Sequence, residues 1–166
     1  MESGPKPYLT FRVAGKNFAI EACRVRAIVP VEELTPFPGM GSSAVLGIAS
    51  LGGRTFAVLD LRVKLDLPQD RSGSRMSDGI APHIVVVSVR EHLAGFIADR
   101  VSDVHAYYAR DLRGGWLRGL GRPRRLLDVE KIIRHTDLVE FWQPGSRMAP
   151  MDQPLATETA PAALPR

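Results

Sequence analysis

The chain has 166 residues, of which 45% are hydrophobic, and its 22 Lys and Arg exceed its 18 Asp and Glu to leave a net charge of +4. This length suffices for one domain or for two small subdomains on a shared core, and such a chain needs no disulfide or metal to fold. The single cysteine, Cys23, excludes an internal disulfide, and no run approaches the ~18 apolar residues of a membrane-spanning helix. With no secretory signal visible, the sequence predicts a cytoplasmic protein without direct membrane insertion.

The first half of the chain is predicted to form short β-strands. Apolar and polar residues alternate with a period of two, which is typical of strands with one buried face. Residues 14–16 turn the first two strands into a hairpin, and Gly52 and Gly53 turn between the last two. Residues 35–43 are rich in Pro and Gly and form a loop, and Asp60 is placed to cap a helical turn. The predicted strands lie at 8–13, 17–22, 24–31, 44–51 and 54–61.

The second half follows the same plan after a polar, Gly- and Ser-rich linker at 68–80. Its first strand is continuously apolar, which indicates burial on both faces. Asp128 heads a second helical turn. Residues 143–166 contain five prolines and are predicted to be disordered, and residues 1–7 form a flexible N-terminus. The predicted strands of this half lie at 83–89, 94–101, 102–108, 116–121 and 124–129.

The two halves form an internal repeat. An offset of 68 superposes Asp60 on Asp128, and a second offset, of 76, superposes apolar positions upstream of them. The pairs under the offset of 76 include Phe11 with Val87, Ile20 with Phe96, Val25 with Val101, and Ile28 with Val104. We therefore expect two related, intertwined units, roughly 8–67 and 81–142. Each has about five strands and one helical turn, which suits a small β-barrel.

No constellation of residues indicates an enzyme or a metal site. The histidines have neither helical i,i+4 spacing nor a cysteine pair nearby: His83, His92, His105 and His135. Ser50 lacks the preceding glycine of a nucleophile elbow, because Ile48 stands there. Three aspartates are interpreted as strand-end and turn residues on a solvated face: Asp99, Asp103 and Asp111. The sequence thus predicts a non-catalytic protein without a cofactor.

Two interpretations of the surface remain. A cleft between two packed barrels is a natural groove for a partner helix or sheet edge, and Val25, Ile28 and Val101 either face it or belong to the core. Arginines also cluster between 110 and 125. We expect them to form a solvated face, with no nucleic-acid partner. The alternative is that they are the phosphate contacts of a basic, barrel-type nucleic-acid-binding protein. The arginines of that alternative are Arg118, Arg122, Arg124 and Arg125.

Three segments together resemble the CheW family of bacterial chemotaxis coupling proteins: 35–68 ("TPFPGMGSSAVLGIASLGGRTFAVLDLRVKLDLP"), 93–104 ("LAGFIADRVSDV") and 116–133 ("WLRGLGRPRRLLDVEKII"). The resemblance extends over residues 8–142. It implies a mainly β fold of two SH3-like five-stranded subdomains. It also implies an adaptor at receptor arrays on the inner face of the membrane, which bridges chemoreceptor tips and a CheA-type histidine kinase.

The resemblance also implies two binding sites. In the family the receptor docks in the groove between the subdomains, and the CheW-like regulatory domain of the kinase packs on the barrel ends. The receptor-binding positions here are Val25, Ile28 and Gly47. The kinase-binding positions are Ser50, Gly52, Gly53, Arg54 and Val101.

This sequence departs from the family pattern at three positions. Gly52 replaces an arginine in the turn, Ala57 replaces a proline, and Ala27 stands where an acidic residue is frequent. Glycine cannot mimic the multi-donor fork of arginine, although Arg54 could supply the charge from a shifted position. We interpret the chain as a divergent member, serving a non-flagellar pathway such as pilus motility or cyclic-nucleotide signalling.

Overall fold

The computed structural model describes residues 4–36, 44–68, 79–119 and 121–133. The predicted tail at 143–166 lies outside these residues, as does most of the predicted linker. Among the described residues, no helix is long and apolar enough to cross a membrane.

Within the described ranges, the first half of the chain forms six strands: β1 (Lys6–Val13), β2 (Lys16–Glu21), β3 (Val25–Pro30), β4 (Thr35–Pro36), β5 (Val45–Leu51) and β6 (Arg54–Leu59). The second half forms six more: β7 (His83–Val89), β8 (His92–Ala98), β9 (Arg100–Tyr107), β10 (Leu112–Arg113), β11 (Trp116–Leu117) and β12 (Arg124–Leu126). Short helices complete the fold: η1 (Ala22–Arg24), η2 (Val31–Glu33), α1 (Leu61–Lys64), η4 (Ala109–Asp111) and α2 (Val129–Ile132).

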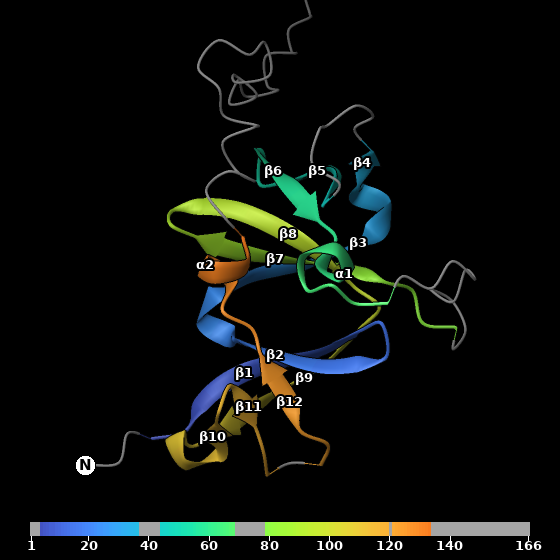
Figure 1. Ribbon diagram of the computed structural model, residues 1–166. Coiled ribbons are helices and arrows are strands. Elements are labelled where there is room, and N and C mark those ends of the chain that lie inside the picture. The colour runs from blue at the N-terminus through green and yellow to red at the C-terminus, as the bar shows by residue number, and fades with distance from the viewer. Residues whose placement is uncertain (1–3, 37–43, 69–78, 120, 134–166) are drawn as a thin grey trace, which may run out of the picture.

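The strands build two mixed sheets, in keeping with the predicted mainly β fold of two subdomains (Figure 1). Sheet A has the order β10-β11-β12-β2-β1-β9, and sheet B has the order β3-β7-β8-β6-β5-β4. Each has six strands rather than the expected five, because the two-residue strands β4 and β10 add an edge. The two orders are equivalent when one sheet is read in the opposite direction. Each of the strands β1 to β6 then occupies the place of the strand six numbers later in the other sheet, so that β1 corresponds to β7 and β6 to β12. Both sheets also contain one parallel pair, β12 with β2 and β6 with β8.

The repeated units exchange their first two strands. Sheet A takes β1 and β2 from the first half and its other four strands from the second, and sheet B does the reverse. The chain therefore crosses between the sheets at two equivalent points. The first crossover, Ala22–Arg24, joins β2 to β3, and the second crossover is the single residue Asp99 between β8 and β9. Sequence periodicity cannot reveal such an exchange, because it reports which residues are buried and not which strand they pair with.

Each sheet curls back on itself. In sheet B the outer strands β3 and β4 are joined by residues 31–34 alone. Five trans peptide steps reach at most about 18 Å, whereas the edges of a flat six-stranded sheet lie about 24 Å apart. The sheet must curve to bring its edges within reach, as an SH3-like subdomain requires. Residues 108–111 impose the same curvature on sheet A by joining β9 to β10.

The main core lies between the sheets and receives side chains from both. The rings of Phe11 and Phe18 stack there with centroids 5.9 Å apart, and Phe96 lies 5.1 Å from Phe11. The predicted helix caps are present: Asp60 accepts the Arg62 N–H at 2.9 Å, and Asp128 accepts the Glu130 N–H at 3.1 Å. The continuously apolar β7 is buried along most of its length, as predicted.

Candidate functional site

Val25 and Ile28 lie on β3, an edge strand of sheet B that pairs only with β7 within the described residues. Residues of β3 are alternately half-buried and exposed. Val25 packs against the main core, and Ile28 is 42% exposed on the other face. The core interpretation therefore fits Val25, whereas a groove facing Ile28 stays a prediction. Val25 is a core residue at the edge, and Ile28 presents apolar surface to solvent.

The second half of the chain provides an equivalent edge in β9 of sheet A. Val101 is half-buried against the same core as Val25, and Val104 is 54% exposed. Val104 was not among the predicted site residues. The sequence feature that could have identified Val104 is its equivalence to Ile28 under the offset of 76. Within the described residues, these two edge strands each expose one large hydrophobic side chain among mostly polar neighbours, and we call them the β3 edge around Ile28 and the β9 edge around Val104.

Both edges carry a β-bulge near their first residues. The register of β3 against β7 shifts between Val25 and Ala27, and that of β9 against β1 shifts opposite Leu9 and Phe11. The buried Thr10 hydroxyl donates to the Asp103 carbonyl at 2.9 Å beside the second bulge. Bulges twist an edge away from regular pairing and so discourage the addition of a foreign strand. A partner would therefore contact side chains of these edges rather than extend the sheet.

Gly47 has a structural role in sheet B. It is buried in β5, where it pairs with Pro36 of β4 and with Val58 of β6. A Cβ atom at this position would collide with the Thr35 carbonyl oxygen. Glycine is therefore required for the close approach of β4, and the structure separates Gly47 from β3 by three strands in the sheet order.

Four of the predicted kinase-binding residues lie together at the β5–β6 turn. Gly52 and Gly53 both have positive φ, +57° and +79°, as two-residue hairpin turns with a primed geometry require. Ser50 and Arg54 flank the turn and are exposed. The Arg54 guanidinium donates to the Glu91 carbonyl in the β7–β8 turn at 3.3 Å. Val101, the fifth predicted residue, lies on the other sheet.

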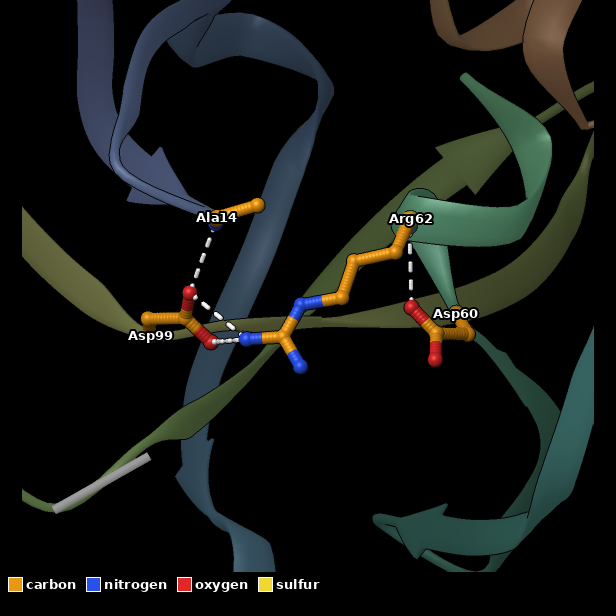
Figure 2. A network of polar contacts seen from close by, with 4 residues as sticks. All are labelled: Ala14, Asp60, Arg62 and Asp99. Carbon is orange, nitrogen blue, oxygen red and sulfur yellow. Dashed lines mark hydrogen bonds and ion pairs between the residues drawn. The ribbon is translucent and has the colours of Figure 1, made fainter. Parts of the chain in front are cut away.

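Asp99 has a role that the sequence did not reveal. It was expected on a solvated face, yet its side chain is only 23% exposed and pairs with Arg62, whose side chain is 11% exposed. The carboxylate also accepts the Ala14 N–H at 2.7 Å. Figure 2 shows that these partners come from the helix α1 and from the β1–β2 turn. A half-buried ion pair with a backbone contact therefore holds the second crossover.

The described residues offer little acid–base or metal chemistry. They contain no group of three or more His, Cys, Asp or Glu side chains that could hold a metal ion. Burial raises the pKa of the Tyr8 hydroxyl, with a smaller contribution from Glu21. Of the arginines considered for nucleic-acid binding, Arg124 donates to the Tyr107 hydroxyl at 2.8 Å.

Comparisons with known proteins agree with this architecture. The CheW-like domain family matches residues 7–137. The chemotaxis protein CheW of Rhizobium meliloti is 25% identical over 114 residues, 68% of this chain and 68% of that protein. CheW of Bacillus subtilis is 30% identical over 96 residues, 58% of this chain and 57% of that protein. The crystal structure of the scaffolding protein TtCheW from Thermoanaerobacter tengcongensis superposes with a TM-score of 0.66 at 16% identity, covering 80% of this chain and 95% of that one.

Proposed function

Because the chain belongs to the CheW-like domain family, we propose that it is a non-catalytic adaptor of a bacterial chemosensory system. In this role it couples the cytoplasmic tip of a methyl-accepting chemoreceptor to a CheA-type histidine kinase. We place it in the cytoplasm at receptor arrays. The name of the structural relative, a scaffolding protein, supports a role in assembly rather than in catalysis.

The observation that carries this proposal is the pair of equivalent edge strands that each expose one large hydrophobic side chain. Ile28 and Val104 are large exposed hydrophobic residues at matching positions of two different sheets. One duplicated unit thus provides two surfaces on one body, as an adaptor for two partners needs. Following the predicted sites, we assign the β3 edge to the receptor and the β9 edge to the CheW-like domain of the kinase.

The β5–β6 turn adds a charged contact to the kinase site. Gly52 brings no side chain to this turn, but Arg54 holds an exposed guanidinium against the neighbouring turn. Guanidinium groups pair well with carboxylates at protein interfaces. We therefore assign the charge of the missing arginine to Arg54, and we expect an acidic residue opposite it on the kinase domain.

The test uses two matched variants, Ile28→Arg and Val104→Arg. Each places a charge in one proposed interface, and both sites are exposed, so circular dichroism should show folded proteins. In titration calorimetry with a receptor-tip fragment, Ile28→Arg should lower the affinity at least about tenfold, because an unpaired charge is costly to bury. Val104→Arg should do so only with the kinase domain. If the wild-type chain binds neither fragment from its own genome, the proposal is wrong.

A nucleic-acid-binding role is the second candidate, and one observation favours it. Trp116 is 42% exposed and lies in register between Arg113 on β10 and Arg125 on β12. An aromatic ring between guanidinium groups is a feature of single-strand binding surfaces. Such binding would weaken steeply with salt. The absence of a gel shift with single-stranded DNA or RNA at low salt would remove this candidate.

A further inference from the structure

We propose that Asp99 and Arg62 are positioning residues for the coupling function. The proposal rests on the adaptor role proposed above and assigns to this ion pair the task of holding the β9 edge in its place relative to sheet B. Neither residue would touch a partner. Each would act through the placement of Val101 and Val104.

The contacts of Asp99 come from two parts of the chain, the helix α1 and the β1–β2 hairpin. Arg62 Nη2 donates to both carboxylate oxygens, at 2.8 and 2.9 Å, and the Ala14 N–H donates to Oδ2 at 2.7 Å (Figure 2). The Asp99 N–H itself donates to the Arg12 carbonyl at 2.9 Å. Charge-assisted hydrogen bonds of this length are among the stronger polar contacts in proteins. Asp99 is therefore fixed to α1 on one side and to the β1–β2 hairpin on the other.

The second crossover is the shortest possible connection that still leaves a residue between the two strands. β8 of sheet B ends at Ala98 and β9 of sheet A begins at Arg100, so Asp99 alone makes the passage between the sheets. Val101 follows two residues later and pairs with Phe11. A displacement of Asp99 would therefore pass directly into the start of the β9 edge.

Arg62 links this passage to sheet B. It is the second residue of α1, which follows β6 directly and begins at the cap Asp60. The same strand β6 begins at Arg54, in the turn assigned to the kinase. The ion pair thus connects both parts of the proposed kinase site, the β5–β6 turn on sheet B and the β9 edge on sheet A. Its loss would let the two parts shift against each other.

The first crossover supplies a matched control. There Arg24 Nη1 lies 2.7 Å from Glu130 Oε1, with side chains 41% and 36% exposed. Within the described part of the chain, neither of these two side chains has a further hydrogen bond to the backbone. Glu130→Gln removes an ion pair at a crossover without disturbing the kinase site.

The experiment compares the full-length variants Asp99→Asn, Arg62→Met, Arg62→Lys and Glu130→Gln with the wild type. Calorimetry gives their affinities for the kinase CheW-like domain and for the receptor-tip fragment. We expect Asp99→Asn and Arg62→Met to lose about tenfold or more towards the kinase domain and less than about twofold towards the receptor fragment. Arg62→Lys should recover part of the loss, because a single nitrogen contacts both oxygens. Glu130→Gln should resemble the wild type.

A second measurement separates failure of this proposal from failure of the adaptor role. Backbone NMR of Asp99→Asn should show faster exchange of the Ala14 amide and shifted resonances from Val101 to Val104, with β3 unchanged. The positioning role is overturned if β9 does not shift, or if the two affinities fall together or not at all. If the wild type binds neither fragment while β9 still shifts, the adaptor role fails, and positioning of the β9 edge stands as a property of the fold.

Discussion

The chain crosses between its sheets twice, and the two crossovers are held by ion pairs of opposite polarity. At each crossover, the second residue of a short helix with an Asp N-cap forms an ion pair with a charged residue of the crossover. Arg62 of α1 pairs with Asp99, whereas Glu130 of α2 pairs with Arg24. The helix positions Arg62 and Glu130 match under the offset of 68, but their crossover partners do not match under the offset of 76, since Arg24 corresponds to Arg100 and not to Asp99. The charges are reversed and the partner at the crossover is displaced by one residue. The pairs also differ in burial. The side chains of Arg62 and Asp99, at the second crossover, are 11% and 23% exposed, whereas those of Arg24 and Glu130, at the first crossover, are 41% and 36% exposed.

This difference shows that the same kind of ion pair can have different effects on stability, depending on its burial. An exposed ion pair adds little free energy, because water solvates both charges well and salt screens them. A half-buried pair with a backbone donor is costly to disrupt, because the remaining groups lose their partners and stay desolvated. We therefore expect the second crossover to be rigid and the first to be tolerant of change.

The largest effect should come from Asp99→Ala. This change leaves the Arg62 guanidinium and the Ala14 N–H without their acceptor, and partial exposure reduces the penalty below that of a fully buried pair. We expect the free energy of unfolding to fall by about 2–3 kcal/mol. Glu130→Ala should lower it by about 0.5 kcal/mol. Urea denaturation measures both, and equal losses would contradict the comparison.

Charge reversal should separate the crossovers next. The double variant Arg24→Glu with Glu130→Arg keeps an exposed pair in which each charge still faces its opposite, so its stability should stay within about 0.5 kcal/mol of the wild type. Arg62→Asp with Asp99→Arg restores the ion pair but offers the Ala14 N–H no acceptor. This variant should remain about 1–2 kcal/mol less stable than the wild type, as thermal unfolding can show. Full recovery at the second crossover would mean that the backbone contact contributes nothing.

The sequence predicted the local features of these crossovers and missed their long-range contacts. The period-two alternation located the strands, and the offset of 68 paired the caps Asp60 and Asp128. A strand's alternation and a helix cap each depend on residues only a few positions apart in the sequence. The partner of Asp99 lies 37 residues away on another element, and its acceptor role depends on the exchange of strands between units. Without that exchange, an aspartate at a strand end is best interpreted as solvated.

The candidate site was predictable to a similar extent. The resemblance pointed to residues on β3 and in the β5–β6 turn, and their binding roles stay predictions. The repeat contained the equivalence of Ile28 and Val104, although only the structure shows that both are exposed on edge strands. Gly47 was expected at a binding surface, and the reason it must be glycine became visible only with the path of β4 beside it.

The helix caps should behave alike and so sharpen the contrast between the ion pairs. Asp60 and Asp128 each accept the N–H of the second helical residue, at 2.9 and 3.1 Å. Asp60→Asn and Asp128→Asn should each cost a few tenths of a kcal/mol, because asparagine also caps well, and replacement by alanine should cost about 1 kcal/mol. Similar values from urea denaturation would locate the difference between the crossovers in the ion pairs. A much larger loss at Asp60 would locate it partly in α1.

Salt should give the smallest effect, and it tests the cause of the difference. A double-mutant cycle of Arg24→Met and Glu130→Gln isolates the energy of the exposed pair, which we expect to be about 0.5 kcal/mol at low salt. At 1 M NaCl the screening length is about 3 Å, so this energy should fall towards zero. The cycle of Arg62→Met and Asp99→Asn should keep most of its value, because the two groups exclude ions from their contact. If salt weakens both cycles in equal proportion, burial does not separate the crossovers, and the rigidity of the β9 edge must come from the packing of Val101.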